Sequence, residues 1–208
     1  MTKPTIEVEI PFAGFYYSVH DSAMDTHLEV FCDDDEDEIE SAFRSIDWHK
    51  ANELYAKFYF DQFLQDFLPR LIDADSSPAI EYGHRWQPAE YNFATDRIFG
   101  VVNADVFERM FEQCDRAALD AEAKRLFTSG PGFMSFYSPR MADWPADRSA
   151  WDVNQNSAVL YGWLRTFGGS DWLQEFQAWE MDFFYLDCIS DNLDEIFGSA
   201  GLNFERAN

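Results

Sequence analysis

The sequence predicts an α+β protein made of one acidic domain over residues 1–208, in which a small, mostly antiparallel sheet packs with several helices beneath a strongly acidic surface. One observation is an alternating apolar and acidic segment near the start, and another is helical periodicity over much of the remaining chain. The third is an abundance of large apolar groups, with 21 Phe, 9 Tyr and 7 Trp in a chain of net charge −24. Disordered acidic segments lack such groups, so we expect this chain to fold.

Strands are expected where β-branched and aromatic residues alternate with polar ones. The segment TIEVEI, Thr5–Ile10, shows this alternation and ends at Pro11. We also expect strands at Ile80–Tyr82, at Tyr91–Val102 and at Phe133–Tyr137. The chain has no internal repeat and no low-complexity linker, which favours one domain.

The first half of the chain contains three expected helices. Asp21 is placed to cap the first, over residues 22–31. The run DDDEDE, residues 33–38, is expected in an exposed turn or at the start of a short second helix that reaches Phe43. The third, Asp47–Leu71, repeats aromatic residues at helical spacing and is expected to be a central core helix.

Two further helical segments, residues 104–114 and 117–127, are expected in the middle of the chain. Residues 138–153 contain prolines and aspartates, which favour a long irregular connection. We expect Trp144 and Trp151 to hold this connection against the core.

The last third is expected to form two helices. The first, Asn156–Phe167, ends before a Gly-Gly pair, and the second begins at Ser170 or Asp171 and continues to Ile189. In the second helix the aromatic residues can point inward while the acidic residues form an outward stripe.

The charge is concentrated at the two ends of the chain. Residues 1–42 contain twelve Asp or Glu and one cation, Lys3, and residues 166–205 contain nine acids with no Lys or Arg. Residues 44–165 are closer to balance, with eighteen acids and thirteen bases. Repulsion among carboxylates that are concentrated in two regions lowers the stability of the fold. We therefore infer that the acidic regions serve a function, and the simplest such function is binding to a basic surface of a partner.

Carboxylates can replace phosphates at such a surface, because Arg forms bidentate pairs with both groups. Duplex DNA presents about one charge per 1.7 Å of axis, whereas an acid at every fourth helical residue presents about one per 6 Å. Several acidic faces would therefore have to align in one strip. The carboxylates expected to act in this way are Asp21, Asp25, Glu29, Asp33, Asp34, Asp35, Glu36, Asp37, Glu38, Asp171, Glu175, Glu180, Asp182, Asp187, Asp191, Asp194 and Glu195.

Two segments, IPFAGFYYSVHD at Ile10–Asp21 and YNFATDRIF at Tyr91–Phe99, resemble segments of acidic proteins carried by phages and plasmids. The charge pattern is also similar to that of phage and plasmid antirestriction and anti-CRISPR proteins, which occupy DNA-binding clefts. This resemblance implies a non-enzymatic inhibitor that mimics DNA charge and occupies the nucleic-acid-binding site of a host restriction or CRISPR complex. Such an inhibitor would bind the basic protein surface and would not bind nucleic acid itself.

Other interpretations stay open. The chain is alternatively a small cytosolic enzyme or ligand-binding protein whose acidity only serves solubility, with a pocket lined by the aromatic residues around Phe15–Tyr17 and Phe133–Tyr137. It is also readable as an interaction subunit that recognises basic partners without DNA geometry. Ordinary solvated helix faces and adaptation to high salt also produce acidic patterns.

No catalytic residue, metal site or cofactor is expected. A calcium loop beginning at Asp33 would need Gly at its sixth position and Glu at its twelfth, where the chain has Glu38 and Arg44. His49 and Glu53 lie one helical turn apart without a second histidine to complete a zinc motif, and His84 has no nucleophilic partner by spacing.

The expected location is the cytoplasm of a host bacterium. The N-terminal residues lack the apolar run of a signal peptide, and no segment approaches the length of a membrane span. The three cysteines, Cys32, Cys114 and Cys188, are widely spaced, as expected for reduced thiols. A two-fold dimer would lengthen a charged strip, but the sequence does not require one.

Overall fold

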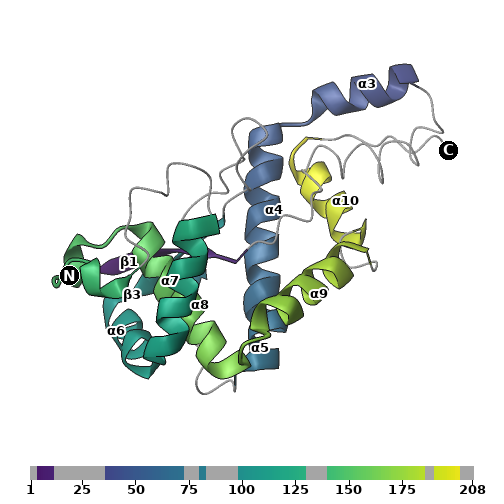
Figure 1. Ribbon diagram of the computed structural model, residues 1–208. Coiled ribbons are helices and arrows are strands. Elements are labelled where there is room, and N and C mark those ends of the chain that lie inside the picture. The colour runs from purple at the N-terminus through teal and green to yellow at the C-terminus, as the bar shows by residue number, and fades with distance from the viewer. Residues whose placement is uncertain are drawn as a thin grey trace. The chain divides into compact units, whose positions relative to one another are not determined.

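The computed structural model describes residues 4–11, 36–72, 80–82, 98–129, 140–185 and 190–201. Over these residues the chain combines a three-stranded antiparallel sheet with helices, so the predicted α+β class is confirmed (Figure 1). None of the described helices has both the length and the apolar character needed to cross a membrane.

The chain divides into two compact units. Unit 1 comprises Met1–Ala13 and Phe60–Gln177, and unit 2 comprises Gly14–Tyr59 and Ala178–Asn208. The expectation of a single domain over the whole chain stays a prediction.

The sheet of unit 1 has the strand order β1-β3-β2, where β1 is Thr5–Ile10, β3 is Ile98–Asn103 and β2 is Ile80–Tyr82. Both neighbours pair with β3 in antiparallel fashion. The predicted strands over TIEVEI and residues 80–82 are therefore confirmed, as is the end of the one predicted over 91–102. Residues 91–97 and the strand predicted over 133–137 lie outside the described residues.

One face of this sheet is buried, and Gly100 shows how closely it is packed. Val8, Ile98 and Val102 on this face are fully buried. A Cβ atom added to Gly100 would lie 2.8 Å from both Ile80 Cγ2 and Phe60 Cε2. A larger residue would force these side chains apart, so glycine is needed for close approach.

Three helices of unit 1, α6 (Ala104–Gln113), α7 (Arg116–Ser129) and α8 (Val153–Gly168), follow the predicted segments. Figure 1 shows α7 beside α8. They approach closely because α8 has Gly162 at the contact, where an added Cβ would lie 2.8 Å from Leu119 Cα.

Helix α8 begins with a capping box and is tied to the sheet. The Asp152 carboxylate accepts hydrogen bonds from the N–H groups of Asn154 and Gln155, and the Gln155 side chain accepts one from the Asp152 N–H. These bonds satisfy N–H groups that the first helical turn leaves free. The Ser157 hydroxyl then accepts a hydrogen bond from the Glu9 N–H at 2.8 Å, which connects α8 to β1.

The predicted irregular connection is confirmed over residues 140–150. It contains two short 3₁₀ turns, Met141–Asp143 and Arg148–Ala150. Trp144 is buried, and its ring centroid lies 5.2 Å from that of Trp151 and 5.8 Å from that of Phe127. The two tryptophans hold this connection in place, as expected.

The long helix predicted over residues 47–71 is present as α4 (Trp48–Gln62), a π-helical segment (Phe63–Phe67) and α5 (Leu68–Leu71). Pro69 gives a physical reason for the wider π turn. Proline lacks an N–H group, and its ring clashes with the carbonyl four residues earlier in a regular α-helix.

Unit 2 contains α3 (Glu36–Ser45) and α10 (Ser190–Ser199). Helix α3 confirms the short helix that was predicted to reach Phe43, whereas the sequence did not predict α10 as a separate helix. The ring of Trp48 lies 4.5 Å from that of Phe43 and 6.2 Å from that of Phe197. This aromatic contact joins α3, α4 and α10. The helix predicted over 22–31 lies outside the described residues.

Candidate functional site

Three exposed acids, here called the acidic stripe, follow the sequence of helix α9 (Trp172–Tyr185). Asp171 directly precedes the helix and Glu175 lies in its unit 1 part, whereas Asp182 lies in its unit 2 part. At 100° per residue these three positions lie within about 40° of one another around the helix axis. Between Thr166 and Glu205 the sequence contains no Lys or Arg, so α9 supplies no cation to neutralise them.

The opposite side of α9 is aromatic and buried. Trp172 and Phe176 are fully buried, and Trp179 is nearly so. In unit 1 the Phe176 ring centroid lies 5.1 Å from that of Phe67, edge to face. The burial of one side therefore fixes which side of α9 presents its carboxylates to solvent.

Glu180 corrects the predicted acidic surface. The sequence placed it beside the outward stripe, but its side chain is fully buried and accepts a hydrogen bond from the Tyr59 hydroxyl at 2.8 Å. The reason is helical geometry, because nine residues after Asp171 is about 180° around the axis. Glu180 is thus excluded from a solvent-facing binding surface.

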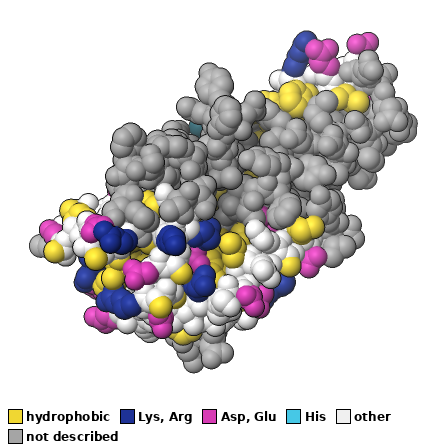
Figure 2. Space-filling view, in the orientation of Figure 1, with side chains coloured by type: hydrophobic (Ala, Val, Ile, Leu, Met, Phe, Trp, Pro, Cys, Tyr) yellow, Lys and Arg dark blue, Asp and Glu magenta, His cyan; other side chains and the backbone are white. Residues whose placement is uncertain are grey.

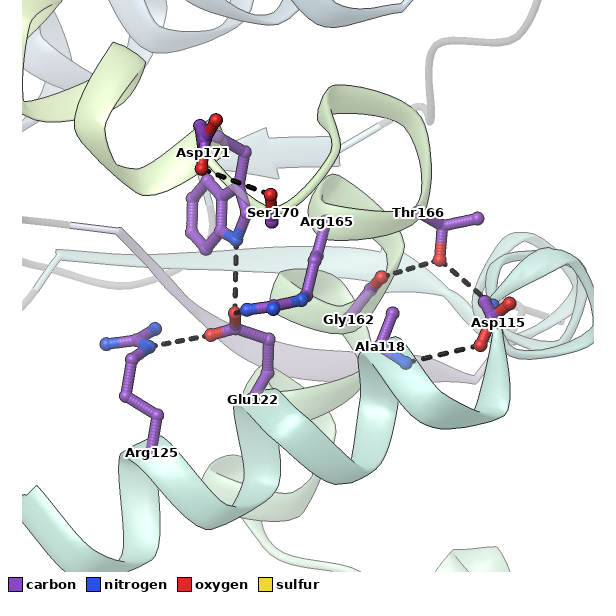
Figure 3. A network of polar contacts seen from close by, with 10 residues as sticks. Asp115, Ala118, Glu122, Arg125, Gly162, Arg165, Thr166, Ser170 and Asp171 are labelled. Carbon is purple, nitrogen blue, oxygen red and sulfur yellow. Dashed lines mark hydrogen bonds and ion pairs between the residues drawn. The ribbon is translucent and has the colours of Figure 1, made fainter.

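The start of α9 is anchored by a buried carboxylate, Glu122 on α7. Its Oε1 accepts hydrogen bonds from Trp172 Nε1 and Arg165 Nη1, both at 3.1 Å, and its Oε2 accepts one from Arg125 Nε at 2.7 Å. Figure 3 shows Glu122 between the two arginines, with Asp171 near the same end of α9. The network holds Trp172, the residue after Asp171, and so positions the first carboxylate of the stripe.

Sequence reasoning did not identify Glu122. Its side chain is 1% exposed, while those of Arg125 and Arg165 are 34% and 32% exposed. The spacing of Glu122 and Arg125 in one helix would have suggested a surface ion pair. The one signal for burial is that Glu122 follows the buried Leu119 by three residues, on the same side of α7.

The other described acidic residues of the predicted surface belong to α3 and α10. Asp37 and Glu38 are exposed on α3, and Glu195 is exposed on α10. In α3 the acid Glu40 forms an ion pair with Arg44, one helical turn later, so part of the charge of this helix is neutralised.

The remaining predicted carboxylates cannot be placed on this surface. The side chains of Glu36, Asp191 and Asp194 are not described, although their backbone lies in α3 or α10. The others lie outside the described residues, and these are Asp21, Asp25, Glu29, Asp33, Asp34, Asp35 and Asp187. Asp171 and Glu175 belong to unit 1, while Asp182 and the α3 and α10 acids belong to unit 2. Their alignment in one continuous strip therefore stays a prediction.

Unit 1 also has a surface of mixed charge. On the face drawn in Figure 2, Lys and Arg side chains gather over the part that holds α6 and α7, with Asp and Glu between them. Ion pairs of this unit include Arg148 with Glu108 and Arg140 with Asp143. These acids of unit 1 therefore have cationic partners, whereas the exposed acids along α9 have no Lys or Arg on their own helix.

The described residues contain no group of three or more His, Cys, Asp or Glu side chains placed to hold a metal ion. Cys114 is a buried free thiol, and its burial raises the pKa to about 11, although the hydrogen bond from Thr166 acts in the opposite direction. Such a thiol stays protonated at neutral pH and is a poor nucleophile.

Comparison with known proteins gave no relative from which a site could be transferred. No protein-family model matches the chain, and neither a curated protein nor a solved structure matches it.

Proposed function

We propose that this protein is a non-enzymatic inhibitor that presents carboxylates in place of phosphates to a basic nucleic-acid-binding surface. The observation that carries the proposal is that Asp171, just before α9, and Glu175 and Asp182 within α9 are each exposed, in a segment without Lys or Arg. A restriction or CRISPR complex of a host bacterium is the proposed class of target, since such complexes hold DNA in basic clefts. The location that follows is the bacterial cytoplasm.

The spacing of the stripe supports this proposal. With a rise of about 1.5 Å per residue, Asp171 and Glu175 lie about 6 Å apart along the axis. Each carboxylate can accept a bidentate pair from an Arg that normally holds a phosphate. Three charges are fewer than a duplex presents over the same length, so the proposal requires the other acidic segments as well.

The test is competition with DNA. The protein is immobilised to capture nucleic-acid-binding complexes from bacterial lysate, and each captured complex is purified and loaded with a fluorescent DNA duplex. We expect the free protein to release the duplex, with an apparent affinity that falls as NaCl is raised. Binding that leaves the duplex in place would contradict the proposal.

A pair of matched variants makes the test specific. The triple variant Asp171→Asn, Glu175→Gln, Asp182→Asn should compete about tenfold less well, since three exposed ion pairs of about 0.5 kcal/mol each are lost. The control variant Asp66→Asn, Glu112→Gln, Asp120→Asn removes the same formal charge from other exposed positions. If both variants lose the same affinity, the effect belongs to net charge and the stripe is not the binding surface.

A further inference from the structure

A cavity of about 340 Å³ in unit 1 lies where the sheet meets the first turns of α6. In the register of the sheet, Thr5 pairs with Asn103, and Glu81 pairs with Val101. Directly opposed residues point to the same face, and so do residues two apart along a strand. These four residues therefore share one sheet face, and all four line the cavity.

Helix α6 supplies the remaining wall. It begins at Ala104, directly after β3, with the Asn103 side chain accepting a hydrogen bond from the Asp105 N–H at 3.1 Å. This tight junction brings Asp105, Val106 and, one turn later, Arg109 to the cavity. The cavity thus joins polar and charged groups with two valine side chains.

Glu81 and Arg109, which both line the cavity, are opposite in sign. Within the described part of the chain Arg109 has no carboxylate at ion-pair distance, and Glu81 has no cation at that distance. One carboxylate and one guanidinium therefore face the same space without neutralising one another.

We propose that this cavity binds a small zwitterion, specifically a free amino acid. Its ammonium group would be held by the Glu81 carboxylate, and its carboxylate by the planar guanidinium of Arg109. Val101 and Val106 provide apolar surface for part of the side chain of the bound amino acid. The volume falls in the range of small-molecule sites, so a side chain fits beside the two charged groups. This site is separate from the acidic stripe, and neither proposal depends on the other.

The experiment is calorimetric titration of the full chain with each standard amino acid at a fixed ionic strength of about 0.15 M. We expect at least one to bind with a Kd at or below about 1 mM. Its N-acetyl derivative lacks the ammonium charge and its amide lacks the carboxylate charge, and each should bind about tenfold less tightly. The proposal is overturned if no amino acid binds with a Kd at or below about 1 mM, or if the derivatives bind as tightly as the amino acid itself.

Variants assign the binding to this cavity. Arg109→Gln and Glu81→Gln should each weaken binding about tenfold, while the controls Arg70→Gln and Glu112→Gln, at exposed positions away from the cavity lining, should bind as the unsubstituted chain does. Thermal unfolding checks that each variant is folded. Arg109→Lys keeps the charge without the bidentate geometry and replaces Arg109→Gln if that variant does not fold. Equal weakening in the cavity variants and the controls would place the binding elsewhere.

Discussion

Glu122 shows how a buried charge can be fully paired and still escape detection in a sequence. Its two oxygens accept three hydrogen bonds, from Arg125, Arg165 and Trp172. Removing one partner from a buried ion pair is costly because the groups left behind lose their counter-charge. Here the cost is reduced, since both guanidinium groups are about a third exposed to water.

Replacing Glu122 with Gln should lower the free energy of unfolding by about 2 kcal/mol, because two arginines would then face a neutral amide. Urea denaturation followed by tryptophan fluorescence measures this loss. The control is Glu108→Gln, whose ion pair with Arg148 is partly exposed and should be worth at most about 1 kcal/mol. An E122Q variant as stable as the unsubstituted chain would mean that Glu122 does not hold the start of α9.

Cys114 gives a prediction that depends on pH. Burial raises its thiol pKa from 9.0 to about 11, so in the folded protein the thiolate is about a hundredfold scarcer at pH 8. Alkylation by iodoacetamide, followed by mass spectrometry of the Cys114 peptide, should therefore be slow in buffer and fast in urea. Fast alkylation of the folded chain would show that this thiol is not protected.

The same pKa shift links stability to pH. Below about pH 9 the thiol is protonated in both the folded and the unfolded chain, and the stability that comes from the shift is fully present. Between pH 9 and about 11 the unfolded chain loses this proton first, so stability falls as the pH rises.

At the scale of the element, α9 separates a structural side from a solvent-facing side. Its aromatic residues and Glu180 are buried, whereas Asp171, Glu175 and Asp182 are exposed. Substitutions on the two sides should therefore have different consequences, with stability affected on one side and partner binding on the other.

The hydrogen bond between Tyr59 and Glu180 tests this separation. Tyr59→Phe removes a donor from a fully buried carboxylate and should lower the free energy of unfolding by about 1 to 3 kcal/mol. Glu175→Gln, on the exposed side, should change it by no more than about 0.5 kcal/mol. Both values come from urea denaturation. The separation fails if Glu175→Gln destabilises the chain as much as Tyr59→Phe does.

Elements set by local patterns could be predicted from the sequence. The alternation of TIEVEI predicts β1, and helical periodicity predicts α6, α7 and α8 within a few residues of their ends. The exposure of Asp171, Glu175 and Asp182 also agrees with the predicted stripe. These features depend on neighbouring residues, and the period of the backbone connects pattern to structure.

Features set by distant contacts could not be predicted. Glu122 is buried because Arg165, on another helix, supplies a counter-charge. The cavity needs a sheet register that brings Glu81 beside Val101, and no local pattern contains that pairing. The misplaced Glu180 is different, since its half-turn offset from Asp171 was already present in the spacing.

At the scale of the whole molecule, the net charge of −24 makes repulsion a general feature of stability. Unit 1 offsets part of it with ion pairs such as Arg148 with Glu108 and Arg140 with Asp143. Helix α9 supplies no cation to its own acids. Screening by salt should therefore stabilise the fold, and a basic partner should do the same.

Raising NaCl from about 0.02 to about 0.5 M should increase the Tm by about 5 °C, because screening reduces repulsion among carboxylates. Differential scanning calorimetry measures the shift, and KCl should have the same effect as NaCl. The triple variant Asp171→Asn, Glu175→Gln, Asp182→Asn has less charge to screen and should show a smaller shift. Over the same salt range, the proposed competition with DNA should weaken, since screening also reduces attraction to a basic surface. A Tm that stays constant or falls would show that carboxylate repulsion does not limit the stability of this chain. Competition that does not weaken with salt would show that the stripe does not act as a set of phosphates.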